Sequence, residues 1–408
     1  MSDKARLAAF NTVKRIFDGA YSNLVLPNNL IGLDKAFAEN IVMGTLERKV
    51  TLEFVLSRFL NRQCEKDVSA LLMTGIYQIL YMDRVPDSAA CDETVNLAKD
   101  LFGVKIAGFV NGVLRNVCRS KSQILKDIDE SEGYIKYSAN KELFDLLKGY
   151  YPQCIDDIFD SFLGKPTTFL RVNTLKTNAE NVAKKTNGRV LDNKCIEVES
   201  LSGVVNLIPY GDFYIQGKAS QDAVKLLDAQ PNDVVVDVCA CPGGKSLGAA
   251  IDMQNKGKVY SFDLHGNKLS LINKSAKTLG IDIIETQQND ARKVIDELVG
   301  IADKVICDVP CSGTGVMGSK PEIKYKSPED FQGLYKTQRT IINEAAKYLK
   351  IGGTMVYSTC SINKIENEEV LAEFLSKNQN FKLIFEKTCL PFEEEREGFY
   401  MAKIIREY

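Results

Sequence analysis

The stretch at residues 234–245 constrains the fold of this chain most strongly. It reads VVVDVCACPGGK, a run of β-branched residues that ends in proline, two glycines and a lysine. Such a run predicts a buried parallel strand that enters a tight turn, and Ser246–Met253 predicts the helix that follows. A strand, a glycine turn and a helix N-terminus form the crevice in which α/β sheets bind nucleotides. A Gly-Gly turn alone is a weak signal, so its surroundings must decide.

From residue 231 onward the apolar pattern alternates between strand and helix. This alternation predicts an α/β, Rossmann-like domain with a doubly wound sheet. We predict strands at 234–238, 258–263, 282–286, 303–308 and 354–359, helices at 246–253, 267–279, 291–298 and 328–349, and a closing pair of strands at 381–387 and 399–405.

The remainder of the chain predicts two further parts. Residues 1–125 carry apolar residues at helical spacing and predict an all-α bundle. Residues 126–230 predict a polar linker, extending over Lys121–Ser138, and a small α+β subdomain with a strand near Arg171. A local excess of lysine and arginine suits this subdomain to an RNA backbone, although scattered surface charges explain it equally well. The catalytic domain would then span residues 231–408.

Composition limits the choice of compartment and partner. The net charge is −2, so no global basic field attracts nucleic acid and any such binding requires local patches. We expect a cytoplasmic protein without a membrane partner, because the sequence has no signal peptide and no run that could span a bilayer. The 11 cysteines form no regular framework and are expected as thiols. The single histidine, His265, and the absence of CxxC pairs argue against a bound metal.

Three aspartates follow successive predicted strands at the edge where a nucleotide would bind. Asp263 is placed to accept hydrogen bonds from ribose hydroxyls, and Asp290 to meet an adenine amino group. Asp308 ends the next strand. Each alone is as consistent with a helix N-cap, but together they favour an adenosine ligand. Because the turn matches neither GxGxxG nor GxxxxGK[ST], a cofactor without a triphosphate fits better.

Two cysteines occupy equivalent positions after the fourth and fifth strands of this pattern. Cys311 lies in DVPCSG and Cys360 in STCS. A single cysteine is more often an inert core residue, but two at matching strand ends favour chemistry. The thiolate is the reactive form, and Lys245 is a candidate for raising its fraction.

These motifs resemble a known family. The segments DVCACPGGK, DVPCSGTGVMGSKPEIKYK and STCSINKIENEE resemble the RNA 5-methylcytosine methyltransferases of the Nol/Nop/Sun group, which use S-adenosylmethionine. The segments AFAENIVMGTLERK and GFVNGVLRN resemble the helical NusB-type RNA-binding fold. The pairing is similar to that in enzymes that methylate cytosine C5 in small-subunit ribosomal RNA. The resemblance departs at Cys241, where alanine is usual, and at Lys218, where an acid is usual.

The resemblance implies a role for each matching residue. Cys360 would be the nucleophile that bonds to cytosine C6, Cys311 would assist release of the adduct, and Asp308 and Lys245 would support catalysis. The substrate would be a single-stranded or flipped cytosine of 16S ribosomal RNA, bound by a monomeric enzyme. S-adenosylmethionine would be bound by Cys239, Ala240, Cys241, Pro242, Gly243, Gly244, Lys245, Asp263, Asp290 and Asp308. The RNA would be held by Arg171, Lys320, Lys324 and Arg339.

Three alternatives compete with this interpretation. A DNA cytosine methyltransferase would use the cysteine at the position of Cys311 as nucleophile and would lack Cys360. A non-catalytic RNA-binding or ribosome assembly factor on a methyltransferase scaffold would not need both cysteines and all three aspartates. A nicotinamide dehydrogenase would need a GxGxxG turn and a catalytic histidine, which the sequence does not provide.

Overall fold

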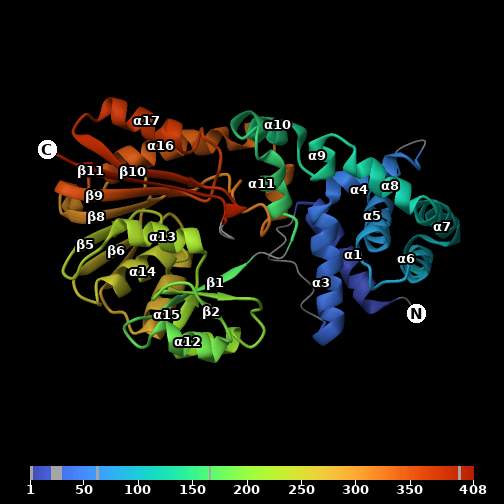
Figure 1. The fold of residues 1–408 in the computed structure, drawn as a ribbon, viewed down its shortest axis with the longest axis horizontal. Helices are drawn as coiled ribbons and strands as arrows, with labels where there is room; N and C mark the ends of the chain where they lie inside the picture. Colours follow the sequence, from blue (N-terminus) through green and yellow to red (C-terminus); the bar gives the residue numbers. More distant parts are fainter. Residues whose placement is uncertain (1–2, 20–29, 61–63, 165–166, 394–396) are drawn as a thin grey trace. The chain divides into compact units, whose positions relative to one another are not determined.

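The computed structural model describes residues 3–19, 30–60, 64–164, 167–393 and 397–408 of the chain (Figure 1). It divides into two compact units. The helical unit comprises Met1–Leu163 and Met317–Ser327, and the sheet unit comprises Gly164–Val316 and Pro328–Tyr408. None of the helices in the described residues is long and apolar enough to cross a membrane.

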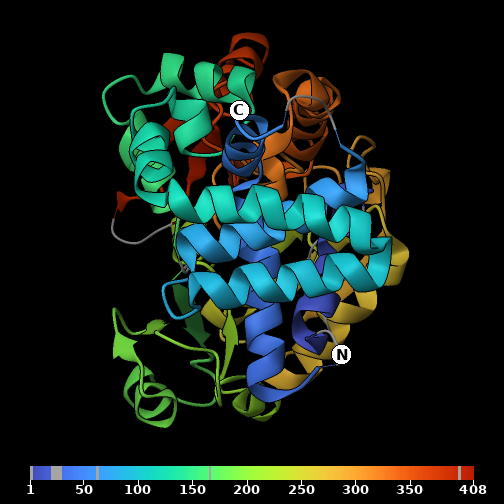
Figure 2. The same cartoon turned by 90° about the vertical axis from the view of Figure 1, so that its right-hand side faces the viewer.

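The helical unit confirms the predicted bundle. Its core is formed by apolar residues at helical spacing, such as Leu72, Ile76 and Ile79, all of which have no exposed surface. Figure 2 shows this unit facing the viewer, with the neighbouring helices α6 (Asp87–Phe102) and α7 (Val104–Arg119) running side by side. The helices are α1 (Lys4–Phe17), α3 (Gly32–Glu47), α4 (Lys49–Ser57), α5 (Lys66–Tyr81), α6 (Asp87–Phe102), α7 (Val104–Arg119), α8 (Lys121–Asp129), α9 (Gly133–Lys136), α10 (Lys141–Tyr150) and α11 (Ile155–Ser161).

The segment Lys121–Ser138 is helical, whereas we predicted a linker there. Helix α8 buries Ile124 and Ile128 in the same core as α5 and α7, and its other side carries the charges that dominate the sequence. Two apolar residues four positions apart are enough to dock a helix when a hydrophobic surface is waiting for them. The predicted boundary at residue 125 therefore falls inside a helix. The helical unit extends to residue 163, and the small α+β part packs with the sheet unit.

A short segment from late in the chain also belongs to the helical unit. This segment, Met317–Ser327, contains the 3₁₀ helix η4 (Pro321–Tyr325). Lys324 has no exposed surface, and its ammonium donates to the backbone oxygens of Glu47 at 2.8 Å and Tyr137 at 3.2 Å. The predicted RNA contact by Lys324 is therefore wrong, because its side chain cannot reach solvent.

The buried lysine makes the stability of the helical unit depend on pH. Burial lowers the pKa of Lys324 from 10.5 to about 7, against the opposing effect of Glu47, while Arg48 lowers it further. At pH values between about 7 and 10.5, Lys324 therefore binds more protons in the unfolded state than in the folded state. The free energy of unfolding should therefore rise with pH, by at most about 1.4 kcal/mol per pH unit.

We expect Lys324→Met to reduce this slope between about pH 7 and 10. The neighbouring exposed lysine provides the matched control, Lys326→Met, which should leave the slope unchanged. Denaturant unfolding followed by circular dichroism measures both variants. An unchanged slope in Lys324→Met would show that this lysine is not neutralised in the folded state.

The sheet unit contains the Rossmann-like domain that the alternating pattern predicts. In the described residues its main sheet has the strand order β10-β11-β9-β8-β5-β6-β7, and a smaller sheet has the order β2-β3-β1-β4. The strands are β1 (Thr168–Val172), β2 (Arg189–Val190), β3 (Cys195–Val198), β4 (Phe213–Ile215), β5 (Val234–Asp237), β6 (Lys258–Asp263), β7 (Ile284–Gln288), β8 (Ala302–Asp308), β9 (Leu349–Thr359), β10 (Phe381–Cys389) and β11 (Phe399–Arg406).

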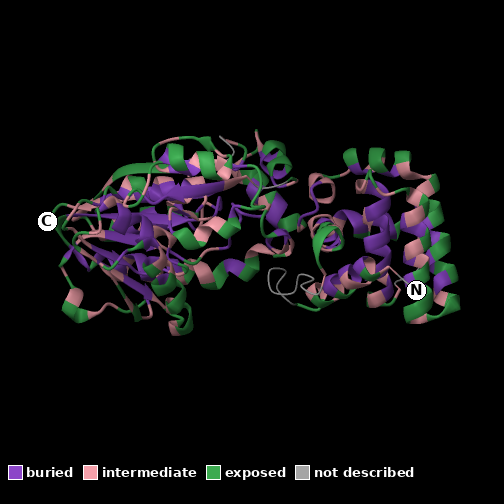
Figure 3. Cartoon of the chain, turned by 90° about the horizontal axis from the view of Figure 1, so that it is seen from below, coloured by how far each residue is buried: buried purple, intermediate pink, exposed green. Residues whose placement is uncertain are grey.

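Helices cover both faces of the main sheet (Figure 1). The central strands are largely buried (purple in Figure 3), and their apolar side chains form one core cluster on each face of the sheet. The helical elements are α12 (Ala179–Thr186), η1 (Val205–Tyr210), α13 (Lys218–Leu227), α14 (Gly244–Asp252), η2 (Gly266–Lys268), α15 (Leu269–Leu279), η3 (Asp296–Leu298), η5 (Pro328–Phe331), α16 (Gln332–Ala346) and α17 (Glu368–Lys377).

The order of the parallel strands locates the ligand crevice. Strands β5, β6 and β7 follow one another outward, and the chain then returns to place β8 on the other side of β5. This reversal opens a crevice at the carboxyl ends of β5 and β8, where α/β proteins bind ligands. Strands β11 and β10 close the sheet antiparallel to β9, as the late runs predicted.

The helix predicted at 291–298 is wrong. Only the short 3₁₀ turn η3 forms there. Val294, Ile295 and Leu298 pack against the main core, and the backbone N–H of Ile295 donates to the hydroxyl of Tyr348 at 3.0 Å. These apolar residues are partly buried by residues that are distant in the sequence. Tertiary contacts therefore outweigh the helical spacing of the apolar residues in setting the backbone conformation here.

Candidate functional site

The glycine turn joins β5 to α14 in the geometry that a nucleotide-binding crevice requires. Gly243 has a φ of +113°, and a Cβ at this position would lie 3.2 Å from a side-chain carbon of Ile272. Glycine is therefore favoured on both conformational and steric grounds. The carboxylate of Asp263, at the end of β6, accepts the backbone N–H groups of Cys241 at 3.2 Å and His265 at 2.9 Å. It thereby ties the turn to the neighbouring strand.

A fourth aspartate, which the sequence argument missed, lies beneath this turn. Asp237 ends β5 and is 1% exposed, and the hydroxyl of Ser246 donates to it at 2.6 Å. Burial raises the pKa of Asp237 to about 7, and Asp308 adds to the rise. The signal was present, because Asp237 occupies the same strand-end position as the aspartates that we singled out.

A cavity of about 510 Å³ lies at the carboxyl ends of these strands. This volume is in the range of pockets that hold cofactors. Its lining includes five residues predicted to bind cofactor and both cysteines, together with three basic residues that we had not assigned. The predicted group is Cys239, Cys241, Asp263, Asp290, Asp308, Cys311 and Cys360, and the basic group is His265, Lys268 and Arg292.

The other residues predicted to bind cofactor shape the turn without lining the cavity. They are Ala240, Pro242, Gly243, Gly244 and Lys245. The cavity thus combines small residues from the turn with carboxylates, which can accept hydrogen bonds from the hydroxyl and amino groups of an adenosine.

Asp290 is already engaged by a neighbouring side chain. Arg292 donates to both carboxylate oxygens, at 2.9 Å from Nε and 2.8 Å from Nη2. This hydrogen bonding lowers the pKa of Asp290 to about 2. An amino group of a ligand at Asp290 would therefore meet an ionised carboxylate that already accepts hydrogen bonds from the guanidinium of Arg292.

Asp308 joins the turn to strand β9. One carboxylate oxygen accepts the ammonium of Lys245 at 2.7 Å, and the other accepts the hydroxyl of Ser358 at 2.6 Å. Lys245 therefore pairs with Asp308, whereas we predicted that it would act on a thiol. The pair is partly buried, with 12% of the Lys245 side chain exposed, so its electrostatic effect is less screened than on an open surface.

The two cysteines meet at the edge of the cavity. The Sγ atoms of Cys311 and Cys360 lie 3.1 Å apart, within hydrogen-bonding distance for thiols. Hydrogen bonding to Cys360 and burial hold the pKa of the Cys311 thiol well above its usual range. Either thiol can donate in this contact, and the raised pKa of Cys311 favours its protonated form.

The loops that carry these cysteines share a buried acid that the sequence argument did not select. Glu366 has no exposed surface and accepts hydrogen bonds from Ser312 and Ser361, the residues directly after the two cysteines. It lies in the segment STCSINKIENEE, but no periodicity or spacing marks it among the other acids there.

Two of the four residues predicted to hold RNA are inside the fold. Arg171 is 1% exposed and pairs with Asp252 at 2.9 Å, so its predicted RNA contact is wrong, as it is for Lys324. A strand residue with an arginine side chain looked basic and exposed, but β1 turns it toward α14. Arg339 pairs with Glu373 at 2.6 Å, and Lys320 is exposed. The RNA contacts of these last two residues stay predictions.

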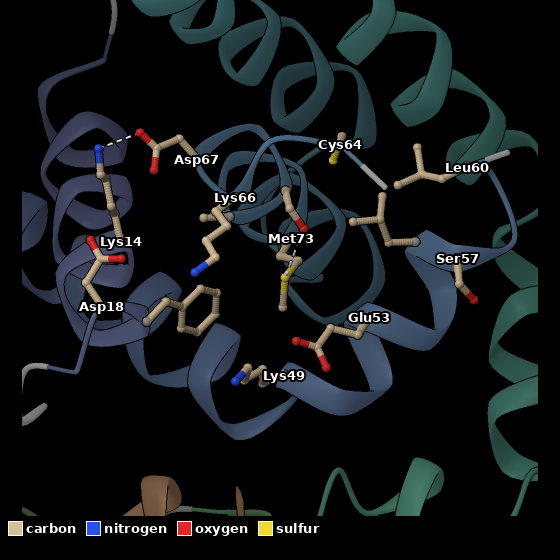
Figure 4. Close-up of a pocket in the computed structure, with 14 residues that line it drawn as sticks. Lys14, Asp18, Lys49, Glu53, Ser57, Leu60, Cys64, Lys66, Asp67 and Met73 are labelled. Carbon is tan, nitrogen blue, oxygen red and sulfur yellow. Dashed lines mark hydrogen bonds and ion pairs between the residues drawn. The ribbon is translucent and has the colours of Figure 1, made fainter. Parts of the chain in front are cut away.

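A second cavity, of about 660 Å³, lies in the helical unit (Figure 4). The ammonium of Lys14 pairs with Asp67 across its rim at 2.5 Å, and Lys66 extends toward its centre. The described lining carries three lysines and three acids, so its formal charges cancel and do not favour a phosphate. The lysines are Lys14, Lys49 and Lys66, and the acids are Asp18, Glu53 and Asp67.

Two families match separate parts of the chain. The family described as 16S rRNA methyltransferase RsmB/F matches residues 224–405. The NusB family matches residues 3–119. The first match covers the cavity and both cysteines, and the second covers the bundle up to the end of α7.

Proteins of the same organisation are similar over nearly the whole chain. The probable ribosomal RNA small subunit methyltransferase B of Bacillus subtilis is 34% identical over 391 residues, which cover 89% of this chain and 86% of that protein. The ribosomal RNA small subunit methyltransferase B of Proteus mirabilis is 29% identical over 421 residues, 98% of each chain.

Solved structures share the fold. The crystal structure of PH0851 has a TM-score of 0.80 at 22% identity over 98% of each chain. NSun6 from Pyrococcus horikoshii, solved with SFG, has a TM-score of 0.60 at 22% identity and covers 66% of this chain and 98% of that chain. With a relative at 34% identity that spans both units, and with the sequence match over the cysteine loops, this chain belongs to the 16S rRNA methyltransferase RsmB/F family.

Proposed function

We propose that this protein is an S-adenosylmethionine-dependent methyltransferase that modifies C5 of a cytosine in 16S ribosomal RNA. The observation that supports this most is the meeting of two sulfurs, 3.1 Å apart, at the edge of a cavity lined by aspartates from successive strands. One thiol is enough for an ordinary nucleophilic enzyme. Two from separate loops suit a reaction that must form a covalent bond to the substrate and later break it.

The cavity residues fit S-adenosylmethionine, which supplies an electrophilic methyl group when bound. Asp263 offers carboxylate oxygens where ribose hydroxyls are expected, and Cys239 and Cys241 let the turn approach the ligand closely. NSun6, which shares the fold, was solved with SFG, an analogue of this cofactor. We assign cofactor binding to these residues and to Asp290.

The chemistry of cytosine explains why a thiolate is needed. C5 is a poor nucleophile in the intact ring. Addition of the Cys360 thiolate to C6 removes the aromaticity and makes C5 enamine-like, so that C5 can accept a methyl group. We assign to the Asp308–Lys245 pair the electrostatic stabilisation of the charge that develops on the ring.

Release of the product then requires the second thiol. After methyl transfer, solvent accepts the C5 proton, the electron pair of that C–H bond forms the double bond between C5 and C6, and the bond between C6 and the Cys360 sulfur breaks to leave a thiolate. The Cys311 sulfur lies 3.1 Å from that sulfur, so its thiol is placed to support the expulsion by donating a hydrogen bond to the departing thiolate. The raised pKa of the Cys311 thiol favours Cys360 as the nucleophile, because a protonated thiol is a poor nucleophile.

The remaining assignments follow from the substrate. Ribosomal RNA is modified in the cytoplasm, so we place the enzyme there, without a membrane partner, and we propose that it acts as a monomer. The target cytosine must be single-stranded or flipped to reach the sulfurs. The exposed Lys320 and the partly exposed Arg339 are the candidates to hold its backbone.

The experiment is incubation of the full-length protein with labelled S-adenosylmethionine and small-subunit ribosomal RNA that lacks the modification. Label should appear as 5-methylcytosine at one position of that RNA, and not in large-subunit RNA. Binding of the RNA without transfer of label would favour the non-catalytic assembly factor instead.

A further inference from the structure

Glu366 is the point at which the two cysteine loops are joined. It lies in the turn that precedes α17 and has no exposed surface. Its Oε1 atom accepts the backbone N–H of Ser312 at 2.7 Å and the side-chain amide of Gln338 at 2.9 Å. Its Oε2 atom accepts the hydroxyls of Ser312 and of Ser361, the latter at 2.6 Å.

Glu366 receives four donors, which match the acceptor positions of a carboxylate. An ionised carboxylate offers about four acceptor positions, and a protonated one would have to use one oxygen as a donor. Within the described residues, no lysine or arginine forms an ion pair with Glu366. Hydrogen bonds therefore have to stabilise this buried carboxylate in place of a cation. Such a group indicates a specific role more than a general contribution to stability.

Ser312 and Ser361 connect the carboxylate of Glu366 to the two cysteines. Ser312 follows Cys311 and Ser361 follows Cys360, so one acid holds each loop at the residue next to its cysteine. Other hydrogen bonds also join the loops, among them the contact between the hydroxyls of Ser312 and Ser361 at 3.2 Å and the donation from the backbone N–H of Ile362 to the hydroxyl of Thr314 at 3.1 Å. The backbone N–H of Gly315 donates to the carbonyl of Cys360 at 3.0 Å, and the side chains of Thr314 and Ser361 are hydrogen-bonded at 2.8 Å.

We propose that Glu366 is a positioning residue that sets the approach of Cys311 to Cys360. This inference rests on the proposed function and adds to it a residue that touches neither cofactor nor RNA. The negative charge of Glu366 also contributes to holding the pKa of the Cys311 thiol high, behind the larger effects of Cys360 and burial. The same carboxylate therefore fixes the geometry of the pair and favours the protonated form of its second member.

The test is Glu366→Gln, which keeps the size of the side chain but replaces one acceptor oxygen by a donor. Glu369→Gln, a few residues along and exposed, is the matched control. We expect kcat for methyl transfer to fall about 10²-fold, the loss typical of a misplaced reacting group. The affinity for S-adenosylmethionine should change less than about threefold, because cofactor contacts are untouched.

A second readout does not depend on activity. Iodoacetamide labelling of each cysteine across pH, followed by peptide mass spectrometry, reports the ionisation of the two thiols. In Glu366→Gln the labelling profile of Cys311 should move to lower pH, and a restored carboxylate in Glu366→Asp should move it part of the way back. A merely structural residue would lower activity without moving this profile.

The outcomes separate this inference from the proposed function. If the parent protein methylates no RNA but Glu366→Gln shifts the Cys311 profile, the positioning role stands and the proposed substrate is wrong. If kcat and the profile both match those of Glu369→Gln, the positioning role is wrong. Should Glu366→Gln not fold, Ser361→Ala removes a single donor and should give the same loss of kcat in milder form. An unchanged kcat in that variant would also overturn the proposal.

Discussion

Cys360→Ala is expected to lower methyl transfer to ribosomal RNA by at least about 10⁴-fold, in line with the loss of a covalent nucleophile in other enzymes. The reason is chemical, because without addition at C6 the ring keeps its aromaticity and C5 does not accept a methyl group. Binding of S-adenosylmethionine should persist, since Cys360 contributes only one of the side chains that line the cavity. Transfer of radiolabel and equilibrium dialysis measure the two quantities separately.

The control for this variant is Cys118→Ala, which removes a half-buried cysteine from the helical unit. It should retain the activity of the parent protein. Activity of Cys360→Ala within tenfold of the parent would contradict the assignment of Cys360 as nucleophile.

Cys311→Ala is expected to trap the enzyme on its RNA. The nucleophile remains in this variant, so the bond between Cys360 and C6 can form and the methyl group can be transferred. The thiol that supports expulsion of the Cys360 sulfur is missing, so the adduct should accumulate. It would be seen as a slower band in a denaturing gel that carries both protein and RNA label, and multiple turnover should be lost.

The double variant Cys311→Ala/Cys360→Ala tests which sulfur forms the bond. It should give no slow band, because neither thiol is present. The role of Cys311 in release is wrong if the single variant turns over many RNA molecules without accumulating an adduct.

Local pattern predicted the elements that position the site. The limits of β6 coincide with those predicted, and β5 differs by one residue, because short segments with apolar residues that follow Pro231 or Gly257 mark their own starts in the sequence. The aspartates and cysteines at the strand ends were found by the same argument, since the carboxyl ends of parallel strands meet at one edge.

Contacts between distant parts of the chain decide the features that local sequence does not predict. Arg171 and Lys324 look like surface cations in a linear sequence, and only the folded chain shows Asp252 and two backbone carbonyls receiving them. The segment 317–327 joins the helical unit although every neighbour in sequence belongs to the sheet unit. The role of Glu366 was also not predicted, because its hydrogen-bond partners come from two loops that are about fifty residues apart in the sequence.

The central claim is that the sulfurs of Cys360 and Cys311 act on one cytosine, the first as nucleophile and the second in release. RNA in which the target is 5-fluorocytidine tests it directly, because fluorine at C5 cannot leave as a proton and the adduct persists. Parent protein, this RNA and labelled S-adenosylmethionine should yield a stable complex, and digestion with peptide mass spectrometry should locate the methylated base on Cys360. A base found on Cys311, or methylation of unsubstituted RNA with no adduct on the fluorinated one, would contradict the claim.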